Sequence, residues 1–344
     1  MLRKIFLISF VFLLLASASV FYLGKQWLNQ PIGFPEQGFN YFVEPGSSLT
    51  STTLNFNAQG YIDFPLLLAR YARIVDKTDI RAGEYRFSQD DTPLSFLEKL
   101  VKGDVVEYQV TLVEGWTFKQ ALKHLHTQEK LVIKLIDENA LNNFYTSLAL
   151  ESGHPEGWFF PDTYQYIAGM SDLQILEQAH LRMRDVLATE WANRLGELPY
   201  KSSYEALIMA SIVERETGVP SEREQIAGVF VRRLENNMRL QTDPTVIYGL
   251  GDQFSGNIRR QHLTQATPYN TYVIKGLPPT PIALPGKESI YAALHPDNGN
   301  ALYFVAKGDG SHQFSSTLEE HNRAVREFQI LRRAKNYQSR PENN

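Results

Sequence analysis

The sequence predicts an α+β fold made of an apolar N-terminal helix, a small α/β subdomain and a larger mixed α+β domain. Three observations lead to this prediction. An uncharged apolar run begins at Ile5, short strand and helix patterns alternate between residues 40 and 105, and longer amphipathic helices alternate with strands and polar loops from residue 106. A chain of 344 residues is longer than one small core needs, which is consistent with several domains.

The N-terminal run is nearly long enough to cross a membrane. Nineteen residues from Ile5 to Leu23 carry no charge, and at a rise of about 1.5 Å each they approach the thickness of a bilayer's hydrocarbon core. Arg3 and Lys4 precede the run, which favours a cytoplasmic N-terminus and an exported remainder. A cleaved signal peptide is the alternative, because residues 16–18 fit a small-residue cleavage site. The run continues past that site, so we expect an uncleaved, single-pass transmembrane helix.

Composition shifts divide the rest of the chain. Proline and glycine residues interrupt any periodicity between residues 25 and 39, which is typical of a linker. The expected divisions are a cytoplasmic stub (1–4), a transmembrane anchor (5–24), a linker (25–39), a small subdomain (40–105), a catalytic domain (106–335) and a disordered tail (336–344).

Charge and cysteine content exclude several classes of function. The net charge of −4 gives no sign of the basic surface that a nucleic-acid-binding protein carries. Cysteine is absent, which excludes disulfides, thiolate catalysis and cysteine-ligated zinc. We predict no cofactor, no metal site and no nucleic-acid partner.

The small subdomain shows a regular alternation of short elements. A strand at residues 41–43 ends in a Glu-Pro-Gly turn, helices are expected after that turn and at 64–75, and a further strand at 83–87. Thr92 is placed to cap a helix that ends at Gly103. The strand, Glu, Gly-turn, helix order recurs at residues 112–115, and such units resemble the glycan-binding modules called LysM. Two unrelated strand–turn–helix corners are the alternative.

The large domain contains the pattern that bears most on function. A helix is expected from Leu173 to Leu195, followed by one that Ser202 and Glu205 open and Gly218 closes. Ser221 and Glu224 form a second such signal, opening a helix that runs to Asn237. After it we expect a long loop region at 241–285, a strand at 302–305 and a helix at 318–333.

Glu216 is the candidate acid/base residue. At about 100° per residue it falls on the apolar face formed by Ile208, Ile212 and Val213, whereas Glu214 projects elsewhere. A carboxyl group at the end of an apolar stripe loses hydration, which favours its neutral form, and the negative end of the helix dipole acts in the same direction. A neutral carboxyl group is what a general acid requires. The alternative is a solvated or ion-paired surface glutamate.

Polar and aromatic residues that could bind a sugar follow this helix. Gln241, Asp243 and Tyr248 offer hydrogen bonds and a stacking face, although Thr-Asp-Pro is also a common start of a helix. Asn270 and Tyr272 precede a Pro-rich run at 276–283, which suits either a groove wall or a stiff surface connection. The aromatic segment 156–164, which also carries two acidic residues, is either a sugar platform or a corner of the core.

Together these segments resemble the endolytic murein transglycosylase family, also called YceG-like. The resemblance rests on Glu-Gly-Trp-Phe-Phe-Pro-Asp-Thr-Tyr at 156–164, Ala-Ser-Ile-Val-Glu-Arg-Glu-Thr at 210–217, Leu-Gln-Thr-Asp-Pro-Thr-Val-Ile-Tyr-Gly at 240–249, Tyr-Asn-Thr-Tyr at 269–272 and the Gly-Leu-Pro-Pro run. The resemblance implies a single-pass inner-membrane protein with its catalytic domain in the periplasm, a LysM-like subdomain, and cleavage inside nascent peptidoglycan strands near the synthases that make them.

The resemblance also implies a catalytic role for the second Glu of the Glu-x-Glu pair, which is Glu216. In the expected reaction this residue protonates the oxygen leaving C1 of N-acetylmuramic acid (MurNAc) and then takes the proton of the C6 hydroxyl, which closes a 1,6-anhydro ring. The expected substrate-binding residues are Glu214, Gln241, Asp243, Tyr248, Asn270 and Tyr272.

Three other functions remain open on the sequence. If Asp243 activated a water opposite Glu216, the protein would be a hydrolytic muramidase. A non-catalytic glycan-binding scaffold would keep the substrate without the reaction. An aminodeoxychorismate lyase-like activity would need pyridoxal phosphate. The expected export of the chain argues against this activity, which belongs to the cytoplasm.

Overall fold

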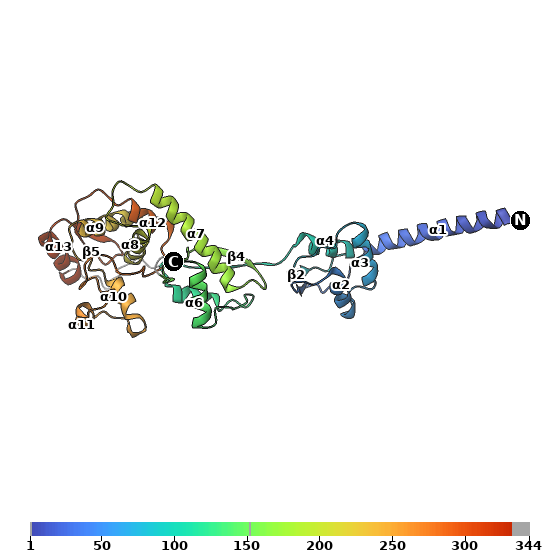
Figure 1. Ribbon diagram of the computed structural model, residues 1–344, viewed down its shortest axis with the longest axis horizontal. Coiled ribbons are helices and arrows are strands. Elements are labelled where there is room, and N and C mark those ends of the chain that lie inside the picture. The colour runs from blue at the N-terminus through green and yellow to red at the C-terminus, as the bar shows by residue number, and fades with distance from the viewer. Residues whose placement is uncertain (1, 151–152, 332–344) are drawn as a thin grey trace. The chain divides into compact units, whose positions relative to one another are not determined.

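The computed structural model describes residues 2–150 and 153–331, and the tail expected at 336–344 lies outside them. The fold is mixed α+β, mostly helical, with small sheets. The chain forms two compact units (Figure 1). The smaller unit contains the chain up to Tyr108 together with Gln165–Met170, and the larger contains Gln109–Tyr164 and the chain from Ser171 onward. The chain passes from the smaller to the larger unit between Tyr108 and Gln109, and the segment Gln165–Met170 belongs to the smaller one.

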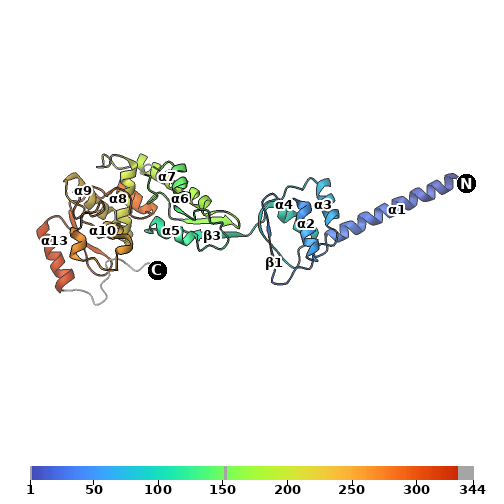
Figure 2. The same cartoon turned by 60° about the horizontal axis from the view of Figure 1, so that its bottom comes forward.

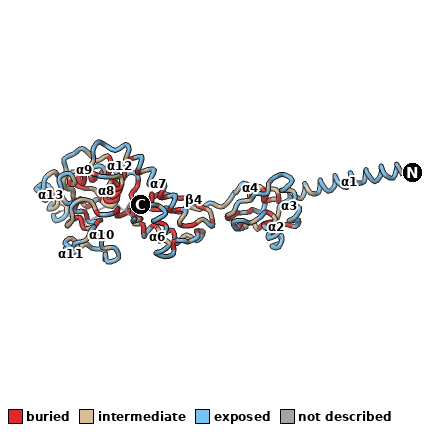
Figure 3. Tube along the Cα trace, in the orientation of Figure 1, coloured by how far each residue is buried: buried red, intermediate tan, exposed pale blue. Residues whose placement is uncertain are grey.

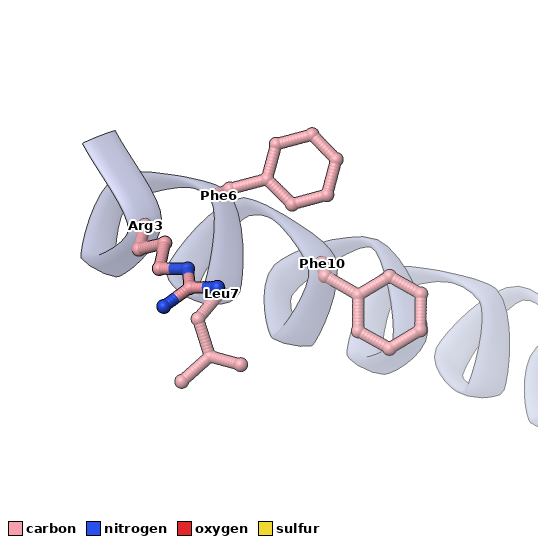
Figure 4. A pocket seen from close by; sticks show the side chains of 4 residues that line it. All are labelled: Arg3, Phe6, Leu7 and Phe10. Carbon is pink, nitrogen blue, oxygen red and sulfur yellow. The ribbon is translucent and has the colours of Figure 1, made fainter.

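The N-terminal helix α1 (Leu2–Leu28) is one continuous apolar helix. The most apolar 18-residue stretch of this helix has a mean hydropathy of 2.4 and none of it is buried, so by length and composition the span Arg3–Leu28 could cross a membrane. Figure 4 shows side chains along its first turns, where Phe6, Leu7 and Phe10 stand free of any neighbouring element. The helix continues five residues beyond the apolar run, and Trp27 and Leu28 pack against the core of the smaller unit.

The smaller unit has the order strand, helix, helix, strand, helix. The elements are β1 (Phe39–Val43), α2 (Leu49–Ala58), α3 (Pro65–Ile74), β2 (Gly83–Phe87) and α4 (Pro93–Lys102). β1 pairs antiparallel with β2, with Phe39 opposite Phe87 and Val43 opposite Gly83. The core between this two-stranded sheet and the helices is aromatic: Phe34, Phe56, Phe87 and Phe96 are buried, and their rings contact one another.

Local sequence signals predicted this unit well. The expected strand at 83–87 and the expected helix at 64–75 are confirmed by β2 and α3. Thr92 caps α4 by accepting a hydrogen bond from the Ser95 amide, and Gly103 ends it with a φ of 73°. A positive φ is a conformation that glycine adopts without steric cost.

The larger unit is a helical assembly with two short β-ladders. Its first part contains β3 (Glu107–Thr111), α5 (Phe118–Leu125), α6 (Glu138–Ser147), β4 (Thr163–Ile167) and α7 (Asp172–Ala192). β3 begins, and β4 ends, within segments that belong to the smaller unit. The second part contains α8 (Ser203–Glu216), η1 (Pro220–Glu222), α9 (Arg223–Glu235), α10 (Asp243–Leu250), η2 (Gly251–Gln253), α11 (Arg260–Thr264), α12 (Lys287–Leu294), β5 (Tyr303–Ala306), β6 (His312–Ser315), α13 (Leu318–Val325) and the π-helix η3 (Arg326–Leu331). β3 pairs with β4, and β5 pairs antiparallel with β6.

Helix α8 lies at the centre of the larger unit. It packs against α7, α9, α10 and α12, and every residue from Ala206 to Val213 is buried. Figure 3 shows α8 among the buried segments of the trace. The expectation of a single apolar face is therefore incomplete, because Leu207 and Ala210 on the other side are fully buried as well. A helix that is apolar all round is a core helix.

The strand, Glu, Gly-turn, helix order expected around 112–115 is present: β3 ends at Thr111, Glu114 and Gly115 lie in a turn, and α5 begins at Phe118. Two other sequence expectations in this unit are wrong in detail. The region 241–285 is not one long loop, since it contains α10 and α11. Helix α9 is present as expected, but its N-cap residue is Glu222 and no side chain caps it, because the single turn η1 leads directly into it.

Candidate active site

The candidate acid/base residue, Glu216, is the last residue of the central helix. Ser202 starts α8 by accepting a hydrogen bond from the Glu205 amide, and the extended backbone of Thr217 ends it. Glu216 is half-buried, whereas the residues of α8 from Ala206 to Val213 are buried in the core. The core thus fixes the helix, and the helix fixes the position of a carboxylate that solvent can still reach.

A hydroxyl group holds this carboxylate. Thr242 Oγ1 donates a hydrogen bond to Glu216 Oε1. Thr242 is buried at the start of α10, where its amide donates to Thr271 Oγ1 (3.1 Å) and its carbonyl accepts from Thr245 Oγ1 (2.8 Å). These bonds fix the backbone at Thr242, so its hydroxyl is presented to Glu216 from a rigid position.

A buried cation lies near the same carboxylate. Arg233 of α9 donates through Nε to the Leu302 carbonyl and through Nη1 to the Leu240 carbonyl, each at 2.7 Å. Burial lowers the pKa of Arg233, and the negative charges of its neighbours, Glu216 among them, oppose that shift. An arginine remains charged in proteins, so Glu216 lies in the field of a fixed positive charge.

Tyr272 and Asp243 complete this polar cluster. The Tyr272 hydroxyl donates to Asp243 Oδ1 at 2.7 Å, and the Tyr272 amide donates to Asn270 Oδ1 at 3.0 Å. Burial raises the pKa of Tyr272, and the nearby carboxylates of Asp243 and Glu216 raise it further. Asp243 follows Thr242 directly and is exposed. The structure therefore brings Glu216, Asp243 and Tyr272 together.

Gln241 and Asn270 border this cluster in different ways. Gln241 is exposed, has a φ of 53°, and its amide donates to the Thr271 carbonyl at 3.2 Å. Asn270 is only 1% exposed, and its Nδ2 donates to the carbonyls of His262 (3.0 Å) and Gln265 (2.7 Å). Asn270 thereby shapes the loop that carries Tyr272, while the side chain of Gln241 faces solvent.

Tyr248 belongs to a second, deeper cluster. Its hydroxyl donates to Glu156 Oε2 at 3.0 Å, and Glu156 Oε1 accepts from the Phe118 amide at 2.8 Å. Burial raises the pKa of Glu156 to about 7, against the opposing effect of these hydrogen bonds. The Tyr248 ring contacts Tyr269 edge to face, and the Tyr269 hydroxyl bonds Thr280 Oγ1 at 2.8 Å. This cluster links the segment 156–164 to the Pro-rich run.

Glu214 holds the start of helix α12. Its Oε2 accepts from the Gly286 amide (3.0 Å) and from Ser289 Oγ (2.7 Å). A carboxylate at a helix N-terminus is favoured by the helix dipole. Glu214 also faces Glu114, whose pKa is raised first by burial and then by the charges of Glu214 and Glu288. Within residues 2–150 and 153–331, no group of three or more Asp, Glu, His or Cys side chains is placed to hold a metal ion.

Two residues of the site were missing from the sequence-based set. Arg233 was not among them because it is one of two adjacent arginines near the end of a helix, a place where cations usually face solvent. Thr242 was noted only as part of the segment 240–249. The positive φ of Gln241 immediately before it redirects the chain, and no residue type in this sequence signals that bend.

Comparisons with known proteins identify the family of this chain. Residues 41–327 match the YceG-like family. The endolytic murein transglycosylase of Bacillus subtilis is 29% identical over 324 residues, which cover 90% of this chain and 89% of that protein. The endolytic murein transglycosylase of Streptococcus pneumoniae is 27% identical over 94% of this chain and 65% of its own length.

A solved structure is similar as well. The crystal structure of a yceG-like protein from Listeria monocytogenes superposes with a TM-score of 0.52 at 30% identity, covering 84% of this chain and 99% of that one. The family match spans most of the chain, including both carboxylates at the end of α8. The resemblance seen in the sequence motifs is confirmed, and the chain belongs to the YceG-like family.

Proposed function

We propose that this protein is an endolytic lytic transglycosylase that cleaves the bond between MurNAc and N-acetylglucosamine inside nascent peptidoglycan strands. The observation that carries the proposal is the setting of Glu216, a carboxylate at the solvent-accessible end of a buried helix, hydrogen-bonded by Thr242 and close to Arg233. The printed names of the relatives from Bacillus and Streptococcus support the same reaction and substrate.

The reaction needs one carboxyl group. Neutral Glu216 gives its proton to the bridging oxygen, the bond from that oxygen to C1 of MurNAc breaks, and the oxygen leaves as a hydroxyl group. The new carboxylate takes the proton of the C6 hydroxyl on the same sugar, whose oxygen bonds to C1. No water is consumed, and the attacking group is already tethered to its target.

The neighbours of Glu216 suit the two halves of this cycle. The positive charge of Arg233 and the hydroxyl of Thr242 both stabilise the carboxylate that remains once the proton has left. The exposed carboxylate of Asp243, held by Tyr272, is placed to stabilise positive charge that develops on the sugar ring. Gln241 is the exposed side chain beside them and is assigned to strand binding.

The other candidate residues take supporting roles in this proposal. Asn270 positions the loop of Tyr272. Tyr248 and Glu156 connect α10 to the first residue of α5, and Glu214 holds the start of α12. Each acts on the site through another residue, so their loss is expected to lower activity less than the loss of Glu216.

The N-terminal parts bring the site to its substrate. Helix α1 is proposed as an uncleaved, single-pass inner-membrane anchor, with the larger unit in the periplasm near the synthases that make the strands. The strand, helix, helix, strand order of β1, α2, α3 and β2 supports the assignment of the smaller unit as LysM-like and glycan-binding.

The test is a digest of uncrosslinked glycan strands by the full-length protein in detergent, read by mass spectrometry. Anhydro-MurNAc ends are expected from the parent, with a rate about 100- to 10,000-fold lower for Glu216→Gln. Glu205→Gln makes the same chemical change at the opposite end of α8 and serves as the control. Products heavier by one water would instead assign hydrolysis, with Asp243 as the base, and intact strands would assign a scaffold.

A further inference from the structure

Helix α3 carries an exposed apolar face that the core of the smaller unit does not use. Leu68, Ala69 and Ala72 point inward and are buried. On the opposite side Leu66 is 54% exposed, Leu67 48% and Ile74 83%. Large apolar side chains that gather on one exposed helix face mark an interaction surface.

The same face is basic. At about 100° per residue, Arg70 and Arg73 fall within the arc of roughly 120° that contains Leu66, Leu67 and Ile74. No acidic residue lies on it. Among the residues that the structure describes, neither guanidinium group forms an ion pair. A helix face that combines Leu, Ile and Arg without carboxylates is typical of helices that lie in the polar surface layer of a membrane.

The end of α1 lies beside this face. Trp27 of α1 contacts Phe64, the residue that precedes α3, with ring centroids 5.7 Å apart, and Phe64 is itself 55% exposed. Both views of the molecule place α3 on the side of the smaller unit where α1 ends (Figures 1 and 2). The apolar face of α3 is thus continuous with the helix that is proposed to cross the membrane.

The dimensions agree with a position at the bilayer surface. The apolar run of α1 ends at Leu23, and Trp27 follows about 6 Å further along the helix axis. The polar layer on each side of a bilayer is about 5–8 Å thick, so Trp27 and its partner Phe64 fall within or at the edge of it. Tryptophan concentrates in this layer, and an arginine guanidinium group forms strong hydrogen bonds with phosphate groups such as those of lipid headgroups.

We propose that the exposed face of α3, formed by Leu66, Leu67, Arg70, Arg73 and Ile74 together with Phe64, rests on the anionic surface of the membrane that α1 spans. The inference depends on the proposed anchoring by α1. The smaller unit then has a fixed side toward the lipid, and its two-stranded sheet of β1 and β2 stays free to bind glycan.

The absence of cysteine makes a direct test possible. Single cysteines in the full-length protein, at Leu67, at Leu15 inside α1 and at Glu44 beyond the Val43 end of β1, would carry a polarity-sensitive fluorophore. The proteins would be reconstituted into vesicles of phosphatidylethanolamine and phosphatidylglycerol that contain nitroxide-labelled lipids. The label at Leu67 is expected to be quenched several-fold more than the label at Glu44, and Arg70→Glu with Arg73→Glu is expected to reduce that difference.

The outcomes separate the inference from its premises. Strong quenching at Leu15 with equal, weak quenching at Leu67 and Glu44 would overturn the inference and leave the anchor intact. No quenching at Leu15 would overturn both. If the fluorescence of the label at Leu67 is not quenched by the nitroxide lipids but changes when uncrosslinked strands are added, the face binds glycan instead. The quenching measurement needs no strand cleavage, which keeps the test independent of the catalytic proposal.

Discussion

At the scale of single residues, the end of α8 separates two carboxylates with different surroundings. Glu214 and Glu216 are two positions apart and so point about 200° apart around the helix axis. One accepts two hydrogen bonds from the start of α12, and the other accepts from Thr242 beside the polar cluster of Tyr272 and Asp243. Because the two carboxylates are two residues apart, one of them can hold α12 in place while the other is available for the proposed chemistry.

Removal of the Thr242 hydroxyl tests its role toward Glu216. Thr242→Val keeps the shape of the side chain but removes the donor, and the rate of anhydro-product formation is expected to fall about 100-fold, as for other single donors in active sites. Thr242→Ser keeps the hydroxyl and is expected to recover most of the rate. Equal losses in both variants would show that packing, not the hydrogen bond, matters there.

Substitutions of Glu214 are expected to act mainly on stability. Glu214→Gln keeps an oxygen that can accept from the Gly286 amide and Ser289, so strand cleavage is expected to persist. Glu214→Ala leaves both donors unpaired and is expected to reduce the free energy of unfolding by about 1–3 kcal/mol. Urea denaturation and the strand digest, run on both variants, would check this. A Gln variant as inactive as Glu216→Gln would instead place Glu214 in the chemistry.

The buried Glu156 predicts a pH-dependent stability. Its pKa of about 7 in the fold lies above the ordinary value of 4.5, so folding favours its protonated form. The stability that protonated Glu156 contributes to the fold is fully present below pH 4.5. As the pH rises through 7 the free energy of unfolding falls, by roughly 3 kcal/mol at most. Glu156→Gln cannot ionise and is expected to be the more stable protein at pH 8, but not at pH 4.5. Denaturation curves at the two pH values would show whether that crossover exists.

At the scale of elements, local signals were more reliable than signals that depend on distant partners. Thr92 and Gly103 delimit α4 because caps act within one turn, and the expected α7 and α8 are present for the same reason. The site depends on contacts that no window of sequence contains. Tyr248 and Glu156 are 92 residues apart, and Tyr272 and Asp243 are 29 apart. Family motifs pointed to these segments, but only the fold shows which side chains meet.

The turn at Gly157 is expected to be intolerant of any side chain. Its φ is +81°, and a Cβ atom there would lie 2.5 Å from the ring of Pro281 in the Pro-rich run. Gly157→Ala combines backbone strain of about 1–2 kcal/mol with a steric clash of about 1–3 kcal/mol. Gly196→Ala, with a φ of +60° and open space around it, carries the strain alone and is the matched control. Thermal unfolding should therefore show a larger loss for Gly157→Ala, and equal losses would argue against a tight contact with Pro281.

At the scale of the whole molecule, one continuous helix joins the apolar N-terminus to a folded unit. The end of α1 contributes Trp27 and Leu28 to the packing around the aromatic core. The small-residue site at residues 16–18 lies inside this helix, on the apolar stretch that the proposal places within the bilayer. Retention of α1 in the mature protein is part of the proposed function.

The intact mass of the protein purified from membranes tests that expectation. The full chain of 39.3 kDa is expected in the membrane fraction, resistant to salt and released by detergent. A soluble chain that begins at Ser19 would show that the N-terminal run is a cleaved signal sequence.

The packing of Trp27 and Leu28 also limits how the protein can be shed from a cell. A protease that cuts before Lys25 would release a unit whose aromatic core is still closed. A cut after Leu28 would remove two side chains that cover that core and leave Phe64 without its aromatic neighbour. In the proposed anchored protein, residues 25–28 therefore both connect the membrane helix to the smaller unit and help to cover its core, so that a cut among them would expose apolar surface.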